Sequence, residues 1–166
     1  MKNNEWGKTI LTVYKYLDRV TEAIDKMVKQ NAMNSFYFSG TNQSRNGVMD
    51  VADRIIALSQ RKVRLINIKV LADKALLECD GGSSQILIER YLDGDNAQTI
   101  ADRHNLNLRT YFRHLVSAEE KFCAIMARYG FGEKRLEKYL ADEKWILEIY
   151  YNFKKNNEIE ELALAI

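Results

Sequence analysis

The sequence predicts an all-helical protein, and three observations carry that prediction. Proline is absent from the 166 residues, so no side chain of that type interrupts a helix interior. Apolar residues recur at steps of three and four along most of the chain. No segment shows the strict alternation expected of a strand. With 46% hydrophobic and 29% charged residues, the chain is expected to bury the core of one domain or of two small subdomains.

Two long helices are expected in the N-terminal region, residues 1–80. The first is predicted over residues 8–32, and residues 33–47, rich in Asn, Ser and Gly, predict a loop in which the aromatic stretch 35–38 tucks against the core. Residues 48–78 are predicted to form one long helix or two helices that meet at Ser59-Gln60. The segment ends at the glycines of residues 80–83, which mark a subdomain boundary. Its expected apolar face is made of Val48, Val51, Ala52, Ile55, Leu58, Ile66, Val70 and Leu77.

Shorter helices are expected after that boundary. Residues 84–92, 96–104 and 108–128 are predicted to be helical, with breaks at 93–95 and 105–107. Gly130 and Gly132 follow the third of them. A last helix is predicted over residues 133–154, packing back on the preceding helices or forming a dimer, with residues 155–166 as a tail.

The breaks between these shorter helices carry specific end signals. Gly94 stands just past one helix, where a left-handed residue is favoured, and Asn105 can take the same conformation at the end of the next. Asn96 and Asn107 can each cap the helix that follows. Four residues of the helix predicted over residues 108–128 are expected to face inward: Leu108, Tyr111, Leu115 and Ala118. Two helices joined by such a tight turn predict a helix-turn-helix domain over residues 83–128.

In a helix-turn-helix the start of the second helix points outward and can enter the major groove of DNA. The residues expected to point outward here are Arg109, Thr110, Arg113, His114 and Ser117. The two arginines can pair with guanine edges, and a threonine near a helix start can bond a phosphate. We expect Arg103 and Lys121 to hold phosphates as well.

The same stretch resembles the fourth conserved region of bacterial sigma factors and the related domains of phage late-gene transcription regulators. The shared frame, within residues 83–122, is Arg90-Tyr91, Gly94, Ile100-Ala101, Leu106, Asn107 and Arg109-Thr110. The resemblance implies promoter binding by the third helix, base-facing roles for Arg109 and Arg113, and a phosphate contact for Thr110. Three positions depart from the family pattern: Asn105 replaces the usual glycine, Asn107 replaces the usual serine or threonine cap, and Phe112 stands where an exposed basic residue is frequent.

The charge distribution favours contact with a polyanion through one face only. Net charge is +2, and residues 53–74 hold six basic and two acidic residues, whereas residues 83–128 hold six of each. We therefore predict a sequence-specific regulator that binds double-stranded DNA, with RNA polymerase or a second copy of the chain as further partners. The alternative is an adaptor that docks on RNA polymerase or another regulator without reading DNA. A third hypothesis is the DNA-recognition subunit of a phage packaging machine.

The sequence does not predict an enzyme. It shows no nucleophile–base constellation and no glycine-rich phosphate loop, and we expect no cofactor. Two histidines and the unpaired spacing of Cys79 and Cys123 do not suggest a metal site. Adjacent acidic pairs, Glu119-Glu120 and Asp142-Glu143 among them, are expected to lie on solvated faces. The chain has no apolar run of 18 residues, and charges at Lys2, Glu5 and Lys8 interrupt its start, so we expect a cytoplasmic protein with no membrane contact.

Overall fold

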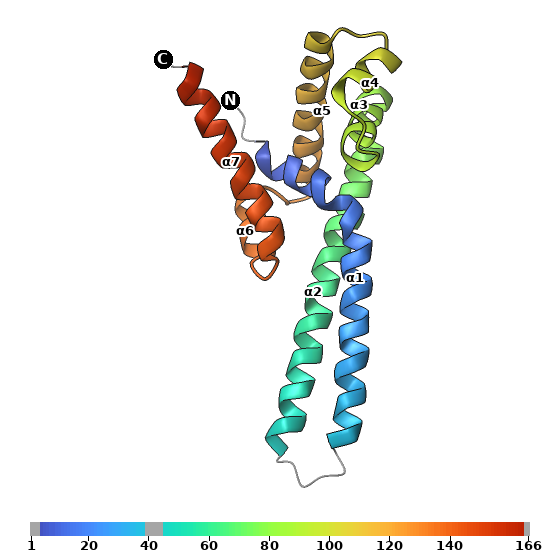
Figure 1. Ribbon diagram of the computed structural model, residues 1–166, viewed down its shortest axis with the longest axis vertical. Helices are drawn as coiled ribbons and strands as arrows, with labels where there is room; N and C mark the ends of the chain where they lie inside the picture. Colours follow the sequence, from blue (N-terminus) through green and yellow to red (C-terminus); the bar gives the residue numbers. More distant parts are fainter. Residues whose placement is uncertain (1–3, 39–44, 165–166) are drawn as a thin grey trace. The chain divides into compact units, whose positions relative to one another are not determined.

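The computed structural model describes residues 4–38 and 45–164 (Figure 1). Within these ranges it contains seven α-helices, one π-helical turn and no strand, which confirms the all-helical prediction. The elements in chain order are α1 (Glu5–Phe38), α2 (Arg45–Glu78), α3 (Gly81–Leu87), the π-helical turn η1 (Ile88–Leu92), α4 (Ala97–Arg103), α5 (Leu108–Arg128), α6 (Glu133–Tyr139) and α7 (Lys144–Leu164). None of the described helices is both long and apolar enough to cross a membrane.

The chain divides into two compact units, and the smaller one, residues 16–69, is a helical hairpin. Its two helical arms, from α1 and α2, run side by side in opposite directions (Figure 1). Leu17 and Ile24 of α1 are buried in it, as are Leu65 and Ile68 of α2. An ion pair of 2.6 Å between Lys62 and Asp25 also links the arms.

The first helix is longer at both ends than the sequence predicts. It begins at Glu5 and continues to Phe38, so the expected loop is wrong for residues 33–38, and residues 39–44 lie outside the described part of the chain. Polar side chains bond back onto the helix instead of breaking it. The Asn31 amide donates to the Met27 carbonyl at 2.8 Å and the Ser35 hydroxyl to the Ala32 carbonyl at 2.6 Å.

The second helix is uninterrupted, but its expected inward face is partly wrong. Leu77 is 85% exposed, and Val48, Ile66 and Val70 are exposed too. Its fully buried residues follow another line along the helix, which comprises Leu65, Ile68, Ala72 and Ala75. Because the sequence carries apolar residues on two faces of α2, periodicity alone did not identify the packed one.

The larger unit, residues 1–15 and 70–166, is built around the first turns of α1. These turns are buried on all sides, which is typical of a central helix. The Trp6 ring packs on Phe131, with ring centroids 6.2 Å apart, and Gly7 lies against Cys123 of α5. The Asn157 amide of α7 donates to the Glu5 carboxylate.

The predicted final helix, residues 133–154, is wrong as a single element. It is broken into α6 and α7 at residues 140–143, and α7 extends through residues 155–164, where a tail was expected. Leu140 and Ile146 on either side of the break are fully buried. The Glu143 N–H donates to the Leu140 carbonyl at 2.8 Å, and the Trp145 indole donates to the Glu143 carboxylate at 2.9 Å. The turn thus buries Glu143, so the prediction that this residue lies on a solvated face is wrong.

Candidate nucleic-acid interface

The turns that precede α4 and α5 have the backbone geometry that their asparagines and Gly94 predict. Asn96 caps α4 by accepting a hydrogen bond from the Thr99 N–H at 2.9 Å, and Asn107 caps α5 by accepting one from the Thr110 N–H at 2.8 Å. Between the helices Asn105 is left-handed, with φ of 54°. Gly94, before α4, is left-handed as well, with φ of 78°.

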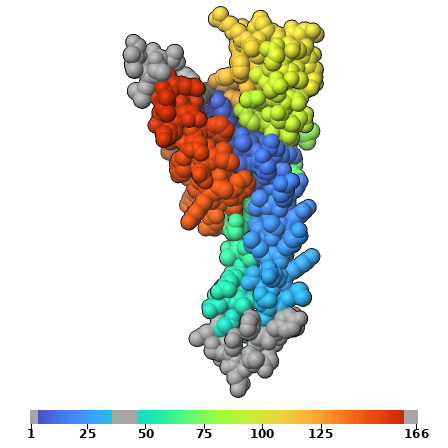
Figure 2. All heavy atoms as spheres, in the orientation of Figure 1, coloured from blue at the N-terminus to red at the C-terminus, as the bar shows by residue number. Residues whose placement is uncertain are grey.

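Apolar packing beneath the turn fixes which side of α5 faces outward. Ile100 and Ala101 of α4 are fully buried, and so are Tyr111 and Ala118 of α5. Leu115 is buried beside them. In Figure 2 the segment from α3 to the first turns of α5 forms one continuous surface, coloured yellow-green to yellow. The N-terminal half of α5 therefore has one face in the core and the other in solvent.

The exposed side of α5 presents two arginines at its centre. Arg109 and Arg113 lie four residues apart, so they follow one another along the same face. Both side chains are exposed, and neither makes a hydrogen bond or ion pair within residues 4–38 and 45–164. His114 and Ser117 are exposed next to them, and Thr110 is half-buried. The structure thus brings together five of the seven predicted contact residues.

Apolar side chains occupy the flank of this face. Leu108, Phe112 and Val116, each four residues from the next, are 41%, 48% and 49% exposed. The prediction that Leu108 faces inward is therefore wrong. The Phe112 ring packs edge-on with Tyr111, with centroids 5.1 Å apart, and about half of its surface stays in solvent. We call Leu108, Arg109, Phe112, Arg113 and Val116 the outer face of α5.

The other two predicted phosphate contacts are already engaged within the protein. The Arg103 guanidinium lies 2.9 Å from the Asp95 carboxylate and 3.1 Å from that of Glu89. The hydrogen bond to Asp95 and then that to Glu89 raise the pKa of Arg103. Lys121 donates to Asp80, the residue that caps α3, at 2.7 Å. It follows Arg109 by twelve residues, about 18 Å along the helix, so it lies far from the start of α5.

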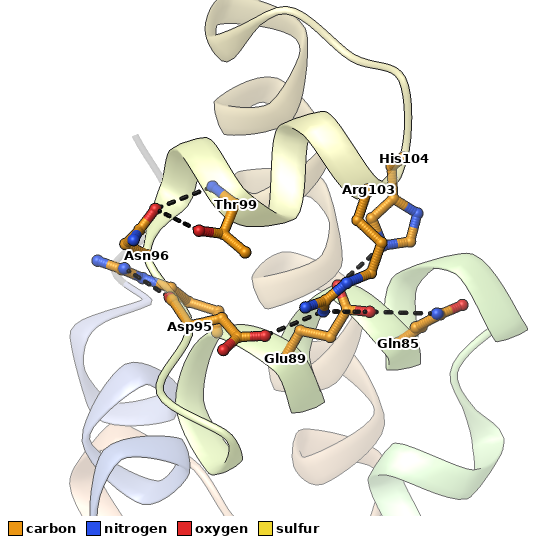
Figure 3. A network of polar contacts seen from close by, with 8 residues as sticks. Gln85, Glu89, Asp95, Asn96, Thr99, Arg103 and His104 are labelled. Atoms are coloured by element: carbon orange, nitrogen blue, oxygen red, sulfur yellow. Dashed lines mark hydrogen bonds and ion pairs between the residues drawn. The ribbon is translucent and has the colours of Figure 1, made fainter.

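A polar network around Glu89 joins the π-helical turn to α4 (Figure 3). The buried Glu89 carboxylate accepts hydrogen bonds from His104 at 2.8 Å, Arg103 at 3.1 Å and Gln85 at 3.2 Å. Burial acts to raise the pKa of Glu89, but these three hydrogen bonds outweigh it, and the pKa is lowered. The carboxylate therefore holds three elements together in its charged form.

A second buried carboxylate, that of Glu119, links α5 to the π-helical turn and to α1. Glu119, which the sequence placed on a solvated face, is 2% exposed and accepts a hydrogen bond of 2.5 Å from the Tyr91 hydroxyl. Lys8 of α1 lies 3.6 Å from it. Burial raises the pKa of Glu119, against the lowering effects of Tyr91 and Lys8. The sequence gives no clear signal for this contact, because a glutamate next to another glutamate is typical of solvent-exposed helix surfaces.

The histidine, cysteine and acidic side chains do not gather into a metal site within the part of the chain that the structure describes. They include no group of three or more His, Cys, Asp or Glu side chains placed to hold a metal ion. Cys79 and Cys123 are buried free thiols, and burial raises the pKa of Cys123 to about 12. Burial raises the pKa of the Cys79 thiol as well, so both thiols favour the protonated form.

Comparison with known proteins adds no family to this description. No protein-family model matches the chain, and it has no significant match among curated proteins or among solved structures.

Proposed function

We propose that this protein is a sequence-specific DNA-binding transcription regulator that inserts the start of α5 into the major groove. The observation that carries the proposal is the pair Arg109 and Arg113, exposed at the centre of the outer face and without partners in the described chain. Unpaired arginines that follow one another along a helix can donate two hydrogen bonds each to guanine edges. The capped, left-handed turn before α5 supports a helix-turn-helix domain of the kind found in the fourth region of sigma factors.

The surroundings of each predicted residue indicate whether it would contact a base or the DNA backbone. Arg109 and Arg113 would contact bases, while the Thr110 hydroxyl, His114 and Ser117 would contact the flanking backbone. Arg103 and Lys121 would contribute less, because their ion pairs must break before they can bind a phosphate. We propose no catalytic role for any of these residues, and we expect the protein to act in the cytoplasm, where bacterial or phage promoters are found.

A single domain of this size offers limited contact with DNA, so a second contact is expected. That contact would be RNA polymerase bound next to the regulator, or a second copy of the chain on an adjacent half-site. A two-fold symmetric target sequence would indicate two copies, and an asymmetric one would indicate a single copy.

The experiment that tests the proposal is selection from a random DNA pool, followed by a salt titration of the enriched sequence. An enriched motif whose affinity falls with salt, by about 0.9 in logarithmic slope for each phosphate contacted, would support it. The R109A/R113A variant should lose selectivity, whereas R128A, at the far end of the same helix and paired with Glu78, should keep it. Failure of the folded protein to enrich any sequence would contradict the proposal.

The adaptor hypothesis is favoured by one observation, the exposed apolar flank of the outer face. Leu108, Phe112 and Val116 could enter an apolar groove of RNA polymerase as the anchors of an amphipathic helix. In that case polymerase capture would survive high salt, and F112A would abolish it, while no DNA sequence would be enriched.

A further inference from the structure

One flank of the arginine pair on α5 consists of exposed apolar side chains. Leu108, Phe112 and Val116 lie there, and we call these three residues the apolar flank. Large apolar side chains that stay in water beside one another mark a surface that a binding partner covers. The chemistry of that partner follows from what lies next to the flank.

The positions of these residues around the helix axis place the apolar flank next to the arginines. At about 100° per residue, Val116 lies about 20° from Arg109, and Phe112 lies about 60° from it, both on the side away from Arg113. Leu108 lies further round, about 100° from Arg109 and toward the buried side of the helix. Phe112 and Val116 therefore approach the same partner as Arg109.

The opposite side of the arginine pair is polar. Thr110, His114 and Ser117 lie there, about 40° to 100° beyond Arg113. Their hydroxyl and imidazole groups can bond phosphate and sugar oxygens, whereas the apolar flank offers a DNA backbone no side-chain donor or acceptor. With α5 in the major groove, the two sides of the helix therefore require different partners.

The major groove presents one apolar group among its base edges. All four bases carry hydrogen-bond donors or acceptors there, and thymine adds a methyl group at C5. An apolar side chain gains by covering that methyl group. Against any other base edge it would remove water from a polar atom without replacing the hydrogen bond, which is costly. The apolar flank therefore fits DNA in which thymines lie beside the guanines that the arginines contact.

We propose that Phe112 and Val116 are specificity-determining residues that contact thymine methyl groups in the target site. This inference rests on the proposed DNA-binding function and names part of its target. Arg109 and Val116 are seven residues apart, about 10 Å along the helix, which corresponds to about three base pairs. The expected target therefore combines guanines for the arginines with at least one thymine inside the same short stretch.

The charge of the domain gives these apolar contacts a large share of the affinity. Residues 83–128 hold six basic and six acidic residues, and Arg103 and Lys121 are already paired within the protein. Few cations are left to neutralise phosphates, which supply the part of DNA affinity that depends on salt. Covering a methyl group removes apolar surface from water instead, so its contribution should be the same at low and at high salt.

The test compares thymine with deoxyuridine, which lacks only the methyl group, in the duplex enriched from the random DNA pool. Each thymine of that duplex is replaced in turn, and fluorescence anisotropy measures the affinity of the full chain. We expect at least one thymine near the guanines whose replacement weakens binding about fourfold, the effect of one buried methyl group. The loss should not change with salt. This series needs no protein variant.

Two variants then assign the methyl contacts to their side chains. F112A and V116A should each bind the thymine duplex less tightly than wild type does, and each should no longer distinguish thymine from deoxyuridine at the position that its side chain contacts. H114A, on the polar side, should weaken binding but keep that distinction. The matched control is I159A, on an exposed residue of α7, which should change neither. Circular dichroism should show unchanged helix content in all four variants.

The outcomes separate this inference from the function on which it rests. A pool that enriches no sequence would contradict the proposed DNA-binding function itself. An enriched site with no thymine within about three base pairs of its guanines would overturn the methyl contacts alone. So would a site in which every thymine can be replaced without loss, or a loss that F112A and V116A both leave intact. A partner protein on the apolar flank would also overturn them, and F112A would then lower capture of RNA polymerase at unchanged DNA affinity.

Discussion

His104 Nε2 lies 2.8 Å from the Oε2 atom of Glu89, so the residue that ends α4 is bonded to the π-helical turn that precedes it. Arg103 reaches the other oxygen of the same carboxylate at 3.1 Å. One buried side chain therefore holds the last two residues before the turn. Since that turn sets the direction of α5, the position of Arg109 and Arg113 depends on Glu89.

The Glu89 network predicts a pH-dependent loss of stability in E89Q. At neutral pH we expect the variant to lose about 2 kcal/mol in free energy of unfolding, because hydrogen bonds to a charged group are replaced by weaker ones. The lowered pKa of Glu89 means that its stabilising contribution is present above its ordinary value of 4.5 and is lost as pH falls through the lowered pKa. Urea denaturation at a series of pH values should show the gap between wild type and E89Q closing on acidification. A gap that stays constant with pH would contradict the prediction.

The raised pKa of Glu119 predicts a variant whose stability, relative to wild type, increases with pH. Its pKa is raised by burial, so the folded state disfavours the charged form, and this penalty develops as pH rises above 4.5. E119Q keeps an acceptor for the Tyr91 hydroxyl and carries no charge. We expect its stability relative to wild type to increase with pH above 4.5, measured by the same denaturation series. The control is E119A, which leaves the half-buried Tyr91 hydroxyl without its acceptor and should be about 1–3 kcal/mol less stable than E119Q at every pH of the series, because neither variant titrates at this position.

Local signals in the sequence account for the parts of this structure that could be predicted. Asn96 and Asn107 are caps, and Gly94 and Asn105 are left-handed, because each of these depends on a few neighbouring residues. For the same reason the start of α5 could be placed at Leu108.

Features that depend on tertiary contacts could not be predicted in this way. The burial of Glu119 requires Tyr91, 28 residues earlier, and the break before α7 has no glycine or proline to mark it. Whether α2 packs through Leu65 or through Val63 is decided by α1, because both faces are apolar. The exposed arginines were predicted, but the engagement of Arg103 and Lys121 in ion pairs was not.

The contact between α1 and α5 predicts a compensating pair of variants. A methyl group added at Gly7 would overlap the Cys123 sulfur, so G7A should lose about 1–3 kcal/mol by overpacking. C123A alone should also be destabilising, because it leaves a small cavity. In G7A/C123A the new methyl fills that space, and we expect the double variant to be more stable than G7A. Calorimetric unfolding of the four proteins measures the coupling, and purely additive losses would show that the two residues do not share this contact.

Because Asn105 is left-handed, we expect the stability of the protein to depend on which residue replaces it. N105A should lose about 1 kcal/mol, because a non-glycine side chain without the local polarity of asparagine is strained at positive φ. N105G should lose none, since glycine adopts this conformation freely. Thermal denaturation of both variants gives the comparison, and equal losses would indicate that the Asn105 side chain makes a contact of its own.

The ion pairs of Arg103 predict that two exposed arginines differ in their effect on DNA binding. R113A should weaken binding to the selected sequence by about 1–3 kcal/mol and relax preference at one base position, because a bidentate contact to a guanine edge is lost. R103A should change affinity much less and leave the preference intact, since its guanidinium is held by Asp95 and Glu89. Fluorescence anisotropy with the selected site and with single-base variants of it separates affinity from selectivity. If R103A instead abolished selectivity while R113A had no effect, the outer face of α5 would not be the surface that meets the bases.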